Sequence, residues 1–247
     1  MLLVVLQLSV QVAAGQPQHY GYEQPGRSGD HLLPAWPDTA TTPGGLYHQL
    51  VASILDLPGA NAFGGGDTAQ THVWGIRFPS FAPEAGYAIT SSWEDDTYRL
   101  VGRQAETMIW PDFDDLVGWQ VGSATASERY AAAATLAGTA MVETCDVPLD
   151  ADLAVRLIDE VNARLAKVRA GLVPKNPPPT IYAATDGTIY WFGGVAFGLT
   201  RNVPQGSDTA LLRGAADAVL DHCFSPDAAT RPALEAVVAA LEASEPG

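Results

Sequence analysis

The feature that most constrains the fold is the stretch 180–192, in which two apolar runs flank the pair Asp186-Gly187. An Asp-Gly pair tolerates the positive φ angles of a type I′ turn, whose twist matches that of paired strands. A turn at this pair predicts a β-hairpin with Ala183 opposite Tyr190 and the strands paired outward from there, Ile181 opposite Phe192. Both faces of this hairpin are largely apolar, so we expect it either to be covered on both sides or to lie centrally in the sheet.

The residues after the hairpin predict a third strand and a helix. Residues 193–201 can continue the sheet, with glycines that favour a bulge or a close backbone approach. Ser207 is a good N-cap, and the apolar residues that follow it recur at helical spacing. They are Leu212, Ala215, Val219 and Cys223. We expect this helical face to pack on the hairpin.

Earlier in the chain the apolar residues alternate, which predicts an antiparallel meander. The alternating runs are residues 72–78, 87–93 and 97–103, with residues 106–110 as a possible fourth strand. Helical spacing predicts helices over residues 46–57, after Asp150, and over residues 234–241. Residues 135–145 fit either the end of an alanine-rich helix or a strand, and the sequence leaves both open.

These elements predict an α+β domain: one or two antiparallel sheets with helices packed on one side. The chain has 247 residues and is 47% hydrophobic, which suits a single domain over residues 46–247. Its formal net charge of −15 repels phosphate backbones, so the sequence predicts no nucleic-acid partner.

The N-terminal region resembles a secretory signal followed by a flexible leader. Residues 1–15 form an apolar run that ends in small residues, and residues 16–45 are rich in proline, glycine and polar residues. The run is shorter than the about 20 residues a membrane span needs. It also lacks a preceding Lys or Arg and contains Gln7. Secretion or a periplasmic location is the expectation; an N-terminal strand or helix, or a start codon assigned too late, is the alternative.

The cysteine content agrees with export. The chain has two cysteines, Cys145 and Cys223, which could form one disulfide across a long loop. Such a bridge stabilises a fold by about 4 to 5 kcal/mol in the chain-entropy model, before strain. Two buried free thiols are the alternative, and a Cys145 thiolate assisted by His72 or His222 would need that state.

Acidic residues beside tryptophans are the strongest candidates for chemistry. Sugar rings stack on indole faces, and glycosidic hydrolysis uses two carboxyl groups. The candidate carboxylates are Glu94, Asp95, Asp96, Asp112, Asp114 and Asp115, and the candidate ligand-binding rings are Trp93, Trp110 and Trp119. The same carboxylates also fit ordinary solvated turns.

Calcium is the one metal that the sequence offers a place for. Asp112, Asp114 and Asp115 could supply oxygen ligands, although the run lacks the glycine and distal glutamate of a helix-loop-helix calcium loop. The histidines and cysteines lack zinc-site spacing, and the sequence has no serine nucleophile elbow and no phosphate-binding loop. The sequence therefore predicts no cofactor apart from a structural calcium.

Three functions fit these observations. The first is a non-catalytic binding domain, secreted or periplasmic, for a protein partner or a small ligand. The second is a glycan or peptidoglycan hydrolase that uses paired carboxylates beside the tryptophans. The third is an accessory subunit of a larger assembly, which would expose a large apolar patch on the hairpin or on the helix over residues 150–170.

Overall fold

The computed structural model describes residues 33–34, 43–60, 69–79, 81–92, 97–117, 126–170, 188–200 and 207–244. The signal-like residues 1–15 lie outside this part of the chain. The strands are β1 (Leu33–Pro34), β2 (Ala69–Phe78), β3 (Ala85–Ser92), β4 (Tyr98–Ala105), β5 (Val142–Leu149), β6 (Ile189–Gly193) and β7 (Phe197–Leu199). The helices are α1 (Pro43–Leu55), α2 (Ile109–Val117), α3 (Ala126–Ala137), α4 (Ala151–Arg169), α5 (Asp208–Phe224) and α6 (Thr230–Ala243).

The strands form one antiparallel sheet in the order β1-β7-β6-β2-β3-β4-β5. The α+β class and the meander of β2, β3 and β4 are therefore confirmed. The fourth predicted strand, 106–110, is wrong, because helix α2 begins at Ile109. Pro111 stands in the first turn of α2, where a missing amide costs no helical hydrogen bond. The place beside β4 is taken by β5.

The predicted pairing within the 180–192 hairpin is also wrong for residues 188–192, the part that the structure describes. Residues 180–187 lie outside the described residues, but β6 has both of its edges occupied. Tyr190 is the partner of Arg77 in β2, and Phe192 is the partner of Gly75 in β2 and of Gly198 in β7. A tight turn closes β6 onto β7, with the Gly194 amide donating to the carbonyl of Ala196 over 3.1 Å. The third strand predicted within 193–201 is confirmed as β7.

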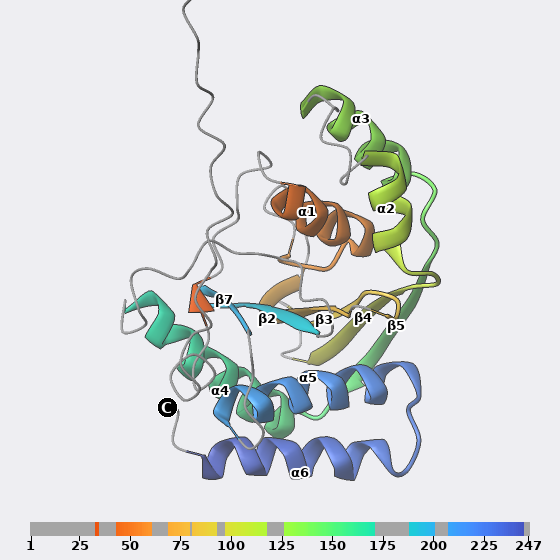
Figure 1. The fold of residues 1–247 in the computed structure, drawn as a ribbon. Coiled ribbons are helices and arrows are strands. Elements are labelled where there is room, and N and C mark those ends of the chain that lie inside the picture. The colour runs from red at the N-terminus through yellow and green to blue at the C-terminus, as the bar shows by residue number, and fades with distance from the viewer. Residues whose placement is uncertain are drawn as a thin grey trace, which may run out of the picture.

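Helices cover both faces of the sheet, which corrects the expectation of helices on one side. Figure 1 shows α1, α2 and α3 on one face and α4, α5 and α6 on the other. Neighbouring residues of a strand point to opposite faces. Val73 and Ile89 accordingly belong to the core under α4–α6, whereas Trp74 and Ala88 belong to the core under α1. The central strands carry apolar side chains on both faces of the sheet, so each face needs its own layer of helices.

The open question over residues 135–145 is resolved by a change of structure within it. Helix α3 ends at Ala137, and strand β5 begins at Val142. Thr139 and Ala140 donate their amides to the carbonyl of Leu136, which closes the turn after the helix. The helical and strand readings of this stretch each describe one half of it.

The C-terminal helices have the predicted caps and buried faces. The Asp150 side chain accepts hydrogen bonds from the amides of Asp152 and Leu153, and the Ser207 hydroxyl accepts one from Ala210. The apolar face of α5 packs on β3, β4 and β5 rather than chiefly on the hairpin strands. In the N-terminal region, Leu33–Pro34 pairs with β7 and α1 begins at Pro43, so ordered structure precedes residue 46. None of the described helices is long and apolar enough to cross a membrane.

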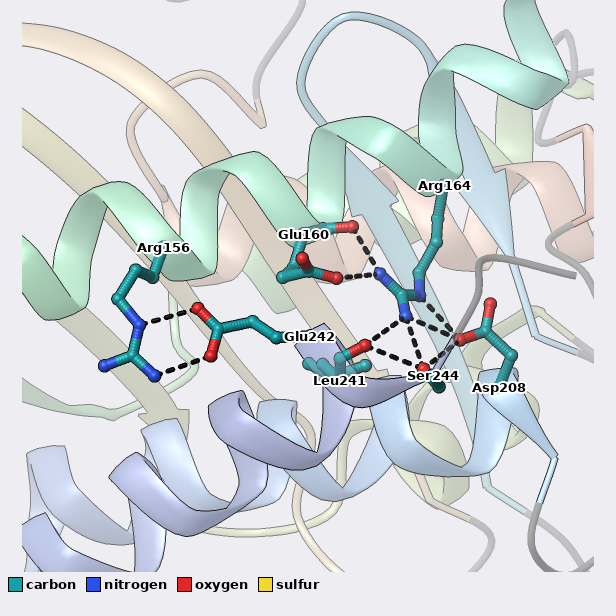
Figure 2. A network of polar contacts seen from close by, with 7 residues as sticks. All are labelled: Arg156, Glu160, Arg164, Asp208, Leu241, Glu242 and Ser244. Atoms are coloured by element: carbon teal, nitrogen blue, oxygen red, sulfur yellow. Dashed lines mark hydrogen bonds and ion pairs between the residues drawn. The ribbon is translucent and has the colours of Figure 1, made fainter.

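A buried arginine joins the three helices of the second layer (Figure 2). Arg164 of α4 is 3% exposed. Its guanidinium donates to Asp208 of α5, to Glu160 of α4, and to the Leu241 carbonyl and Ser244 hydroxyl at the end of α6. The shortest contact to Asp208 is 2.6 Å. The network therefore fixes the start of α5 and the end of α6 against α4.

Replacing Arg164 by methionine tests this network. Arg164→Met leaves the Asp208 and Glu160 carboxylates without their shared cation, and breaking a buried ion pair costs about 3 to 5 kcal/mol. We expect the free energy of unfolding, measured in urea, to fall by about that amount. The matched control is Arg156→Met on the same helix, which removes an exposed pair with Glu242 and should cost much less. Equal losses in the two variants would contradict the assignment.

Candidate interaction surface

The predicted disulfide is present. Cys145 of β5 and Cys223 of α5 are bonded, with a Cα–Cα distance of 5.8 Å and a sequence separation of 78. Both cysteines are buried. The bridge ties the edge strand β5 to the helix that covers it, and it leaves neither sulfur as a thiolate nucleophile.

The bridge depends on a glycine that the sequence analysis did not identify. Gly102 of β4 stands opposite Cys145 in the sheet. A Cβ atom at Gly102 would lie 2.7 Å from the Cys223 Sγ and 3.2 Å from the ring of Phe224. The absence of a side chain at residue 102 therefore gives the bridge its room between the sheet and α5.

A methyl group at residue 102 should disturb this contact. Gly102→Ala forces Cys223 and Phe224 away from β4, and overpacking of this kind costs about 1 to 3 kcal/mol. We expect a lower midpoint of unfolding under non-reducing conditions, with a thiol assay reporting whether the bridge persists. Gly138→Ala is the control, because the nearest atom to its added Cβ is 3.5 Å away. A Gly102→Ala variant as stable as this control would refute the steric argument.

The structure describes only part of the predicted acid-and-tryptophan site. Trp93, Glu94, Asp95, Asp96 and Trp119 lie outside the described residues. Asp114 and Asp115 are described only as backbone within α2. Asp112 is exposed in the first turn of α2, and the Trp110 ring packs edge-on against Tyr47 with centroids 4.9 Å apart.

Neither a carboxyl pair nor a calcium site is defined by this arrangement. Among the candidate carboxylates, Asp112 is the one whose side chain the structure describes. Among the described residues, no three His, Cys, Asp or Glu side chains are placed to hold a metal ion. The hydrolase and the calcium site at Asp112, Asp114 and Asp115 therefore remain predictions.

A buried carboxylate that sequence reasoning missed anchors α2. Glu84 precedes β3 and is fully buried. Its carboxylate accepts hydrogen bonds from the Tyr47 hydroxyl and from the backbone amides of Ile109 and Trp110, the latter two over 2.8 and 3.2 Å. Burial, the negative charge of Glu84 and the hydrogen bond from the Tyr47 hydroxyl to Glu84 all raise the pKa of Tyr47. Glu84 thus caps α2 from a distant part of the chain, a role that no local pattern signals.

A second polar cluster connects the opposite face of the sheet to α5. Asp217 accepts hydrogen bonds from the Tyr190 hydroxyl over 2.5 Å and from Arg77 over 3.2 Å. The Arg213 guanidinium lies over the Tyr190 ring, 5.1 Å from its centroid. Burial, followed by the hydrogen bond to Asp217, raises the pKa of Tyr190. These contacts keep the tyrosine protonated and position α5 against β2 and β6.

His72 and Ser91 form a hydrogen-bonded pair at a bulge in β2. The register between β2 and β3 shifts between Thr71 and Val73, so His72 is the inserted residue. One ring nitrogen of His72, Nε2, lies 2.8 Å from the Ser91 hydroxyl, and the His72 ring packs against Tyr98. Burial lowers the pKa of His72. The pair joins two adjacent strands. The bulge also explains why His72 and Trp74, two residues apart, do not share a face of the sheet as simple alternation predicts.

His48 is a buried titratable group in the first layer. The His48 ring packs against Phe78 and Trp191, with centroid distances of 4.5 and 4.2 Å. Burial lowers the pKa of His48 to about 3, from an ordinary value of 6.5. The folded protein therefore holds a neutral imidazole where the unfolded chain would take up a proton.

This depressed pKa makes stability depend on pH in a defined direction. Between pH 6.5 and pH 3 the unfolded chain binds a proton at residue 48 that the folded protein does not. The free energy of unfolding should therefore fall as the pH is lowered, by up to about 1.4 kcal/mol per pH unit from this residue. Urea unfolding from pH 6.5 down to about pH 5, above the main carboxylate titrations, measures the slope. His48→Leu should reduce that slope, and an unchanged slope would contradict the prediction.

Several exposed residues lie in the segments at one end of the sheet, where β2 and β4 end and β3 and β5 begin. Phe81 and Met141 are the most exposed large apolar side chains of the described residues, at 77% and 66%. Met108 is half-buried. The exposed acidic residues nearby in the chain are Glu106, Asp112 and Glu143.

Backbone hydrogen bonds join the segments at this end of the sheet. The Ala105 amide donates to the Glu84 carbonyl over 2.9 Å, and the Glu106 amide donates to the Met141 carbonyl over 3.0 Å. These bonds link the loop before β3, the β4–α2 connection and the start of β5. Asp112, in α2, is the one predicted site residue that the structure both describes and exposes.

Comparisons with protein-family models, with curated proteins and with solved structures found no match for this chain.

Proposed function

We propose that this chain is an exported domain, periplasmic or extracellular, which binds a protein partner or a small ligand without catalysing a reaction. The observation that supports export most directly is the bond between Cys145 and Cys223. Disulfides persist in oxidising compartments and are rare in reducing ones. The apolar run over residues 1–15 adds the pattern of a secretory signal.

The exposed apolar side chains support the binding role. Phe81 and Met141 lie at one end of the sheet with most of their surface in water. By contrast, the apolar face of α4 is buried in the core, where Leu157, Val161 and Leu165 are inaccessible. Contiguous exposed apolar patches mark protein contact sites, whereas singly exposed apolar residues are common on protein surfaces. The exposure of Phe81 and Met141 supports contact at this end of the sheet, and the buried face of α4 offers no surface for a subunit contact.

Mass spectrometry of the protein recovered from its native host tests the export proposal. We expect a mature N-terminus near Gln16 and a mass lower by two hydrogen atoms, because Cys145 and Cys223 are bonded. Reduction and alkylation should then restore both thiols. An intact Met1 together with two thiols that react without prior reduction would overturn the proposal.

A further inference from the structure

We infer that the cluster of Arg77, Tyr190, Arg213 and Asp217 binds the carboxylate group of a small ligand. The inference rests on the proposed binding function, and it specifies the chemistry of the small ligand and the place where it binds. Three properties of the cluster support it: two guanidinium groups that converge, one positive charge in excess, and access from solvent.

Two arginines from different elements converge on Tyr190. Arg77 of β2 is the sheet partner of Tyr190 in β6, and its guanidinium reaches Asp217 of α5 over 3.2 Å. The Tyr190 hydroxyl donates to the same oxygen of Asp217, Oδ1, over 2.5 Å. Arg213 precedes Asp217 by one turn of α5, and its guanidinium lies 5.1 Å from the centroid of the Tyr190 ring. The four side chains therefore form one cluster between the sheet and α5.

This cluster carries one positive charge more than it carries negative charge. Asp217 balances the guanidinium of Arg77, and Tyr190 is neutral because burial and its hydrogen bond raise its pKa. Arg213 forms no ion pair within the described part of the chain. Several other arginines each have a carboxylate partner, namely Arg99, Arg156, Arg164 and Arg231.

The size of the excess selects the class of anion. One carboxylate would make the cluster neutral. A doubly charged phosphate or sulfate would leave it negative, in a chain whose formal net charge is already −15. A singly charged carboxylate is therefore the anion that fits.

The arginines have hydrogen-bond donors available for a carboxylate. A guanidinium has five N–H donors, and a carboxylate accepts two of them side by side. Arg77 donates to Asp217 through Nη1, whereas its buried Nε has no acceptor among the residues that the structure describes. An unmet donor that is shielded from water is costly, so an added acceptor is favoured.

The cluster is also accessible to a small anion and partly pre-arranged. The side chains of Arg77 and Asp217 are 24% and 44% exposed, and Arg213 is half-buried. Charges interact more strongly in such a partly buried place than in bulk water. The contact of Arg213 with the Tyr190 ring restricts the guanidinium, so less side-chain freedom is lost when a ligand binds.

Acetate binding to the full, oxidised chain tests the inference. Acetate is the probe, acetamide is its neutral counterpart of the same shape, and sulfate is the doubly charged alternative. NMR of the isotope-labelled protein, at constant ionic strength, follows the Nε–H signals of the arginines. We expect acetate to shift the Arg77 and Arg213 signals in a saturable way, with a dissociation constant of about 1 to 10 mM. Acetamide should shift neither signal.

Variants assign the binding to the cluster. Arg213→Met removes the guanidinium that has no carboxylate, and acetate should bind at least tenfold more weakly. Asp217→Asn keeps an acceptor for Tyr190 but removes the competing negative charge, so acetate should bind several times more tightly. The control is Arg231→Met on α6, an exposed arginine paired with Glu235, which should bind acetate as the unaltered chain does. Circular dichroism and the midpoint of unfolding confirm that each variant is folded.

Each other outcome overturns the inference. Equal acetate binding by Arg213→Met and Arg231→Met would mean general counterion attraction. Weaker binding by Asp217→Asn would contradict the charge excess on which the site depends. Tighter binding of sulfate than of acetate would assign the cluster to doubly charged anions. None of these results depends on export, which the mature N-terminus and the cysteine state report separately, so failure of the site and failure of the proposed compartment are distinguishable.

Discussion

Burial of the central strands on both faces is the constraint on which the rest of the structure depends. Strands β2 and β3 are apolar at successive residues, as Val73 and Trp74 illustrate. Burying apolar surface is the dominant favourable term in folding, and a sheet of this kind exposes too much of it unless both faces are covered. The two sets of helices follow from that requirement, and they place two separate cores on either side of one sheet.

Each layer is fixed to the sheet by specific polar or covalent links in addition to apolar contact. In the second layer, the disulfide attaches α5 to β5, and Arg164 joins α4 to the ends of α5 and α6. In the first layer, Glu84 caps α2 and binds the Tyr47 hydroxyl of α1. Apolar burial is non-directional, whereas these hydrogen-bonded groups accept only one arrangement of their partners. They therefore select which helix lies where.

Polar links also fix the segments at one end of the sheet. Glu84 lies beneath the start of α2, and the backbone bond between Glu106 and Met141 joins β4 to β5. The side chains above this frame, Phe81 and Met141, remain exposed. The proposed binding role rests on the exposure of these two side chains beside a hydrogen-bonded frame.

Local pattern in the sequence determined much of the secondary structure. Periodicity and capping residues predicted α1, α4, α5 and α6, alternation predicted β2, β3 and β4, and the even cysteine count predicted the bridge. These features depend on neighbours within a few residues, which the sequence displays directly. The fold class was predictable from the order of these elements.

Only the tertiary structure decided the features that join distant segments. Strand β6 pairs with β2 and β7 rather than with the run before Asp186, because the apolar pattern alone does not choose between possible partners. Helix α2 stands where a strand was expected, and its first amides donate to Glu84, 25 residues earlier in the chain. The room that Gly102 leaves for the disulfide and the exposure of Phe81 have the same origin. Each results from contacts between residues far apart in the chain, which no local window of the sequence contains.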